Sequence, residues 1–127
     1  MPTTITVCTT CRQPALREAK AGDPCGETLL QALIEAAQAH ADLRVRGAAC
    51  LMGCEHGCNL ALSAPSKMTY VLGRFEPTAE AAAAVVDYAA LHAGSAAGVV
   101  PYRSWPQGVK GHFIARVPPE DPGPPAL

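Results

Sequence analysis

The chain has 127 residues, of which 49% are hydrophobic and only 5% aromatic, as expected for one domain with a core of aliphatic and small side chains. Ten Lys and Arg nearly balance eleven Asp and Glu, for a net charge of −1, and no basic cluster exists, which argues against a nucleic-acid partner. The sequence shows no membrane-spanning stretch and no secretion signal, so we expect a cytoplasmic protein with reduced thiols.

The first half of the chain predicts a strand, a helix and a second strand. β-branched residues alternate over residues 3–8, which is typical of a strand. Asp23 and Pro24 resemble a helix start, and leucines at helical spacing predict a helix over residues 25–40. A short alternating stretch at residues 43–48 predicts the next strand.

The second half predicts a hairpin and a second helix. Residues 59–63 and 68–72 read as two antiparallel strands joined by a turn at residues 64–67. Residues 77–78 open an alanine-rich helix, for which Gly94 is the stop signal. The resulting β-α-β-β-β-α order predicts an α/β fold of the thioredoxin-like type.

Three parts follow from this reading. We expect a thioredoxin-like domain over residues 1–94 and an irregular extension, residues 95–117, packed on that domain. Residues 113–117 could add a short extra strand. Residues 118–127 are proline-rich and are expected to be a disordered tail.

Cysteine usage is the main functional signal. All six cysteines lie in the first half of the chain, at Cys8, Cys11, Cys25, Cys50, Cys54 and Cys58. In a reducing compartment, such a cluster indicates metal or redox chemistry rather than a disulfide framework.

The predicted topology can bring four of these cysteines together. Cys8 ends the first strand, Cys25 begins the helix, and Cys50 and Cys54 follow the second strand. A right-handed crossover between two parallel strands places all three positions at one edge of the sheet. Four thiolates there suit either a structural zinc or an iron–sulfur cluster.

The spacing of the cysteines favours the iron–sulfur alternative. Structural zinc sites usually contain two C-x2-C pairs, whereas here only Cys8 and Cys11 have that spacing. Gly26, Gly53 and Gly57 would let backbone N–H groups approach the sulfides of a cluster.

Three motifs carry a family resemblance. The run CLMGCEHGCNL at residues 50–60 resembles the C-L-x-x-C-x-H-G-x-N signature of the thioredoxin-like [2Fe–2S] ferredoxins. The segment ITVC at residues 5–8 and the Cys25-Gly26 helix start are similar to that family's first two ligand sites, so the resemblance spans about residues 3–91.

The resemblance implies a site and a function. It implies a [2Fe–2S] cluster in a homodimeric one-electron carrier that serves redox partner proteins and is not an enzyme. The ligands that it implies are Cys8, Cys25, Cys50 and Cys54. Cys11 and Cys58 depart from the family pattern, but each lies a few residues from a predicted ligand and could replace a lost neighbour.

A second resemblance covers the whole chain. Residues 101–106 and 114–119 look like parts of a bacterial family of predicted metal-binding proteins, whose members are often encoded near cobalamin-synthesis genes. This resemblance implies a role in cobalamin synthesis.

Two other functions stay open. A thiol–disulfide oxidoreductase would use Cys8 and Cys11, because thioredoxins place a C-x-x-C motif after the first strand. A zinc- or cobalt-binding module without redox function would use the same thiolates as metal ligands.

Residues outside the cysteine motifs are interpreted as structural. His92 is expected at the end of the second helix, where a positive charge is favourable. Trp105, with Arg103, Lys110 and Arg116, could form a docking surface for an acidic partner, but we favour a tryptophan that fastens the extension to the core.

Overall fold

The computed structural model describes residues 2–9, 25–49, 51 and 58–119. At Cys25 it describes the backbone but not the side chain. The expected loop and helix cap before Cys25, the loop that contains Cys50 and Cys54, and the tail after residue 119 fall outside these ranges. The described elements are, in order, β1 (Thr3–Cys8), α2 (Cys25–Ala37), β2 (Leu43–Ala48), β3 (Leu60–Ser63), β4 (Thr69–Leu72), α3 (Ala79–Gly94), the 3₁₀ helices η1 (Tyr102–Ser104) and η2 (Gln107–Val109), and β5 (Phe113–Val117).

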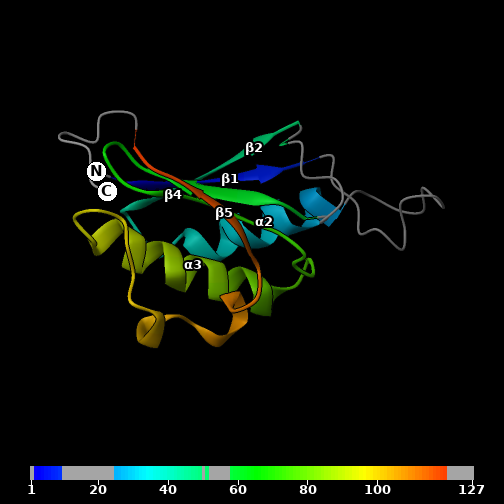
Figure 1. The fold of residues 1–127 in the computed structure, drawn as a ribbon. Coiled ribbons are helices and arrows are strands. Elements are labelled where there is room, and N and C mark those ends of the chain that lie inside the picture. Colours follow the sequence, from blue (N-terminus) through cyan, green and yellow to red (C-terminus); the bar gives the residue numbers. More distant parts are fainter. Residues whose placement is uncertain (1, 10–24, 50, 52–57, 120–127) are drawn as a thin grey trace.

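The strands form one mixed sheet in the order β2-β1-β3-β4-β5. β1 and β2 are parallel, with α2 as the crossover between them, and every other neighbouring pair is antiparallel. Both helices cover the same face of the sheet (Figure 1). The predicted α/β fold with its thioredoxin-like order of elements is therefore confirmed.

The boundaries of the elements follow local signals. The strand predicted at residues 43–48 matches β2, and the predicted hairpin is the β3–β4 pair. α3 begins where the Thr78 hydroxyl accepts a hydrogen bond from the Ala81 N–H at 3.2 Å. The helix extends through Gly94 before it ends, and the N–H of Ser95 then caps the carbonyl of His92.

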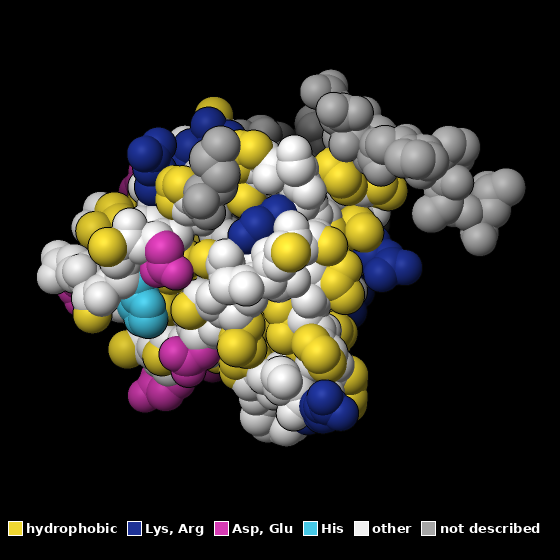
Figure 2. Space-filling view, turned by 90° about the vertical axis from the view of Figure 1, so that its left-hand side faces the viewer, with side chains coloured by type: hydrophobic (Ala, Val, Ile, Leu, Met, Phe, Trp, Pro, Cys, Tyr) yellow, Lys and Arg dark blue, Asp and Glu magenta, His cyan; other side chains and the backbone are white. Residues whose placement is uncertain are grey.

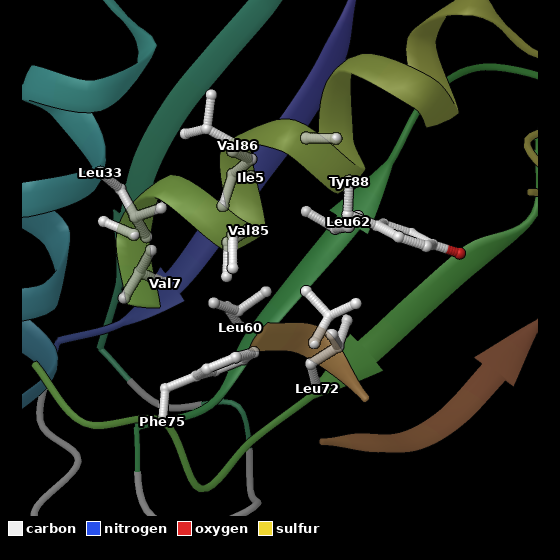
Figure 3. Close-up of a cluster of buried hydrophobic side chains, with 14 of the residues drawn as sticks. Ile5, Val7, Leu33, Leu60, Leu62, Leu72, Phe75, Val85, Val86 and Tyr88 are labelled. Carbon is white, nitrogen blue, oxygen red and sulfur yellow. The ribbon is translucent and has the colours of Figure 1, made fainter. Parts of the chain in front are cut away.

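The core lies between the sheet and the two helices. Because side chains alternate along a strand, Ile5 and Val7 of β1 both point to the helical face, where they are fully buried. Leu33 of α2 and Val85 of α3 meet them there, as Figure 3 shows. This packing places β1, which lies between β2 and β3 in the sheet, against both helices.

The segment after α3 adds a fifth strand to the sheet. β5 pairs antiparallel with β4 and forms one edge, so the extra strand suggested by the sequence is present. Trp105 lies ahead of it, donates its indole N–H to the carbonyl of Val100 at 2.9 Å, and packs against Tyr88 of α3. Trp105 thus fastens this segment to the core, as expected.

The amino end of β1 closes on a buried polar network. The Nε2 of His92 lies 2.7 Å from the carbonyl of Met68, and its Nδ1 lies 2.8 Å from the hydroxyl of Thr3. Since a carbonyl only accepts, Nε2 carries the proton and Nδ1 accepts from Thr3. Lys67 donates to the carbonyls of His92 and Ala93 at the end of α3.

This network corrects the expectation for His92. The imidazole is fully buried, and burial lowers the pKa of His92 below its ordinary value, so the ring is held neutral. The cation at the end of α3 is instead Lys67, which comes from the turn between β3 and β4. The sequence correctly indicated a positive charge at the end of α3, but Lys67 provides it instead of His92.

Candidate functional site

Cys8 lies at the carboxyl end of β1 and is 1% exposed. By alternation its side chain points to the sheet face opposite to Val7. Its Sγ donates a long hydrogen bond of 3.9 Å to the carbonyl of Ala49. Cys8 is therefore a buried thiol at the carboxyl edge of the sheet.

The first turn of α2 packs directly on the backbone of Cys8. A Cβ added at Gly26 would lie 1.8 Å from the carbonyl oxygen of Cys8, a distance that no side chain tolerates. Only glycine permits this approach, so the sequence Cys25-Gly26 sets the start of the helix beside Cys8. The side chain of Cys25 itself lies outside the described residues.

The loop between Ala48 and Asn59, which carries Cys50 and Cys54, is hydrogen-bonded at both of its ends to the end of β1. The N–H of Thr9 bonds to the carbonyl of Ala48 at 2.8 Å, just before Cys50 in the chain. The N–H of Cys8 bonds to the carbonyl of Asn59 at 2.9 Å, just after Cys58. The loop that carries the C-x3-C motif therefore leaves and re-enters the sheet on either side of Cys8.

Three chain segments that carry predicted ligands thus converge on one edge of the sheet. The expected gathering concerns Cys8, Cys25, Cys50 and Cys54; the structure places Cys8 and the backbone of Cys25, while Cys50 and Cys54 lie outside the described residues, as does Cys11. Within the described ranges, no three His, Cys, Asp or Glu side chains are grouped as a metal site. The ligand set remains a prediction.

Cys58 has a different setting from Cys8. Its side chain is fully buried among the core residues, and its backbone has a φ of 42°, in the left-handed region that few residues other than glycine adopt. Its sulfur forms a disulfide whose partner is not among the described side chains. Cys58 therefore points toward the helical face rather than to the side of the sheet where Cys8 lies.

A hollow of about 480 Å³ opens beside this edge. Thr9 lines it from the end of β1, and Glu27, Thr28 and Gln31 line it from the first turns of α2. Leu30 completes the lining, so the hollow beside the cysteine segments has polar and apolar walls.

The backbone contacts fix the segments at this edge against one another. They are the tight Gly26 contact, the hydrogen bond from the Cys8 N–H to Asn59 and that from the Thr9 N–H to Ala48. Fixing of this kind is what a protein contributes to a metal site, because it orients side chains before a metal binds.

Comparisons with known proteins place the fold. A solved structure described as a thioredoxin-like [2Fe–2S] ferredoxin from Aquifex aeolicus superimposes with a TM-score of 0.58, covering 94% of this chain and 96% of that one at 16% sequence identity. No curated protein matches the chain by sequence. In the described ranges, no helix is long and apolar enough to cross a membrane.

The match in fold extends over nearly the whole length of both chains. A model of one protein family matches residues 5–119, which contain every described strand except the first two residues of β1. The chain therefore belongs to the family described as "Protein of unknown function (DUF1636)".

Proposed function

We propose that the protein is a one-electron carrier with a [2Fe–2S] cluster at the carboxyl edge of β1. The observation that carries this proposal is the convergence on Cys8 of the Gly26 turn and of both ends of the loop between Ala48 and Asn59. The likeness in fold to a thioredoxin-like [2Fe–2S] ferredoxin supports it.

Cys8, Cys25, Cys50 and Cys54 are the proposed ligands. Bound there, the cluster would supply a site that accepts and releases one electron without a change in bonding. Cys8 is held by hydrogen bonds from its own N–H and that of Thr9, so its sulfur has a fixed position. Burial of Cys8 limits access of water to the sulfur, which protects a cluster and tunes its potential.

The proposal also includes the cellular location, oligomeric state and partners of the carrier. We place it in the cytoplasm as a homodimer that exchanges electrons with redox partner proteins and serves cobalamin synthesis. The sheet has β2 and β5 as its edges, and a strand edge is a surface that a second copy can cover.

Anaerobic purification followed by metal and sulfide analysis tests the proposal. We expect a coloured protein with about two iron and two acid-labile sulfide per chain. A colourless protein with about one zinc or cobalt per chain and no sulfide would replace the carrier by a metal-binding module.

One observation favours a second candidate, thiol–disulfide exchange. The disulfide at Cys58 means that two cysteines of this chain are close enough to bond. An exchange function would use such a pair in both oxidised and reduced forms. Protein that lacks iron and sulfide but reduces a disulfide substrate, with loss of activity in Cys58→Ala, would favour this candidate over the carrier.

A further inference from the structure

A second cavity, of about 330 Å³, opens between the β4–β5 edge and the segment after α3. We call it the aromatic cavity. Its walls are mostly apolar, formed by the aromatic residues Tyr70, Trp105 and Phe113 and the aliphatic residues Val99, Val100 and Ile114. This volume and lining are typical of sites for small organic molecules.

The aromatic rings that line the cavity pack against one another. The rings of Tyr70 and Phe113 meet nearly at right angles with centroids 5.5 Å apart, and Phe113 and Trp105 lie 4.5 Å apart at 34°. Trp105 is held further by its hydrogen bond to Val100. A ligand would therefore enter a preformed cavity and would order few side chains on binding, which favours affinity.

The lining of the cavity contains one charged side chain. This is Arg116, the only charged residue in the lining among the described residues. The chain from residue 95 to 119 also contains Arg103 and Lys110, and Glu120 and Asp121 follow directly. An anionic group in the cavity would be attracted to Arg116. On the face shown in Figure 2, basic side chains lie at the upper left, near the centre and on the right, and acidic ones lie on the left.

A buried hydroxyl group lies behind the aromatic walls. Tyr88 of α3 is fully buried, and its ring packs edge-on against Tyr70, Trp105 and Phe113 at centroid distances of 5.9, 6.0 and 5.2 Å. Its hydroxyl has no hydrogen bond of normal geometry in the described part of the chain. Burial raises the pKa of Tyr88, and the nearby Tyr70 hydroxyl raises it further. Figure 3 shows the Tyr88 hydroxyl pointing away from the aliphatic core. A buried hydroxyl of this kind costs free energy until an acceptor reaches it.

We propose that the aromatic cavity binds a small planar aromatic molecule with an anionic group. Its ring packs against Trp105 and Phe113, and its anionic group is paired with Arg116. Tyr88 lies behind these walls and supports them through its contacts with Trp105 and Phe113. This site is separate from the cysteine edge and needs no metal.

Fluorescence titration with 8-anilinonaphthalene-1-sulfonate tests the proposal, because the probe combines fused aromatic rings with an anion. Trp105 is the only tryptophan of the chain and lines the cavity, so its emission reports on binding there. We expect saturable quenching of Trp105 at one probe per chain. N-phenyl-1-naphthylamine has the same rings without the sulfonate and should bind about tenfold more weakly.

Two variants locate the contacts. Arg116→Gln should weaken sulfonate binding about tenfold and leave binding of the neutral probe unchanged. Arg103→Gln, an exposed arginine of η1 outside the cavity, is the matched control and should keep wild-type affinity.

Two results would overturn the proposal. One is an absence of saturable Trp105 quenching in the wild-type protein, including the case in which light scattering shows that a second copy covers the cavity. The other is equal sulfonate affinity in Arg116→Gln and Arg103→Gln, which would mean that the probe binds an apolar surface without recognition of its charge. A tenfold difference between these two variants would support the proposal, and the site would then be assigned to Arg116 and the aromatic walls.

Discussion

The two ends of β1 use polar side chains in opposite ways. At the amino end, Thr3, His92 and Lys67 bond to one another and to backbone carbonyls, so the protein supplies every partner. At the carboxyl end, Cys8 is buried at a point where other cysteine-bearing segments converge. The polar network at the amino end is fully hydrogen-bonded within the protein, whereas the cysteines at the carboxyl end would be stabilised by a bound metal centre.

Within β1, the amino end therefore contributes to the stability of the fold and the carboxyl end to the proposed function. A satisfied polar network fixes how α3 and the β3–β4 turn sit on β1. A group of thiols contributes little stability through hydrogen bonds, because cysteine sulfur forms only weak ones. We therefore expect the thiols at the carboxyl end to bind a metal or to take part in a redox reaction. Variants at the two ends should therefore fail in different assays.

The largest expected effects lie at the cysteine edge. Cys25→Ser and Cys50→Ser should remove nearly all iron and the visible absorbance, because neither has another cysteine within three residues to replace it. Cys54→Ser should be as damaging, because Cys58 is four residues away and buried in the core. Cys8→Ser should destabilise the cluster less, because Cys11 is three residues away and can substitute in part. Iron and sulfide analysis with visible spectra measures this order.

Cys11→Ser and Cys58→Ala are the controls for the ligand variants. Both should keep wild-type iron, sulfide and spectra. Alanine is preferred at Cys58 because a serine hydroxyl would be buried in the core there. If Cys58→Ala bleaches the protein and Cys25→Ser does not, the ligands must be reassigned around the loop that ends at Cys58.

Gly26→Ala should affect both the cysteine edge and the fold. The new methyl group would collide with the carbonyl of Cys8, so α2 must shift away from β1. We expect a loss of about 3 kcal/mol in the free energy of unfolding, together with loss of iron. Gly94→Ala is the matched control, since nothing lies within 4 Å of its added Cβ, and it should be neutral. Equal behaviour of the two variants in urea unfolding would contradict the packing described for Cys8.

At the amino end, His92→Leu should lower stability by about 2–4 kcal/mol without a direct effect on metal content. The variant leaves the Thr3 hydroxyl and the Met68 carbonyl buried without their partner. His40→Leu changes a histidine that is only partly buried and should alter stability by about 0.5 kcal/mol or less. Chemical unfolding of the two variants measures the contrast, and a His92→Leu protein as stable as His40→Leu would refute it.

A smaller effect is the pH dependence that His92 produces. Because burial lowers its pKa in the folded state, the unfolded chain binds a proton at higher pH than the folded chain does. The stability that the neutral ring provides is complete above the ordinary value of 6.5 and is lost as the pH falls below it, through the lowered pKa of the folded state. Unfolding curves from pH 8 to pH 5 should show this decline, and it should be much reduced in His92→Gln.

Much of the fold could be predicted from local sequence patterns. Alternating β-branched residues located β1, and Thr78 marked the start of α3 through its side-chain hydrogen bond. The role of His92 could not be predicted, because its partner Thr3 lies 89 residues away and only packing brings them together. β5 was suggested only weakly, since a short edge strand depends on its pairing with β4.

The site was predicted by topology rather than by local pattern. The parallel crossover between β1 and β2 was enough to expect that Cys8 and the loop after Ala48 would meet. The contact between Gly26 and Cys8 adds a detail that spacing alone does not contain. The aromatic cavity was missed, because Tyr70, Trp105 and Phe113 come from three separate segments with no shared motif.

Electron paramagnetic resonance of the reduced protein tests the central claim most directly. Protein purified without oxygen is titrated with dithionite, and the signal is integrated against the protein concentration. We expect uptake of about one electron per chain with a spin-one-half signal of about one spin per chain, absent from Cys25→Ser. A protein that takes up no electron, gives no signal and contains zinc in place of iron would contradict it.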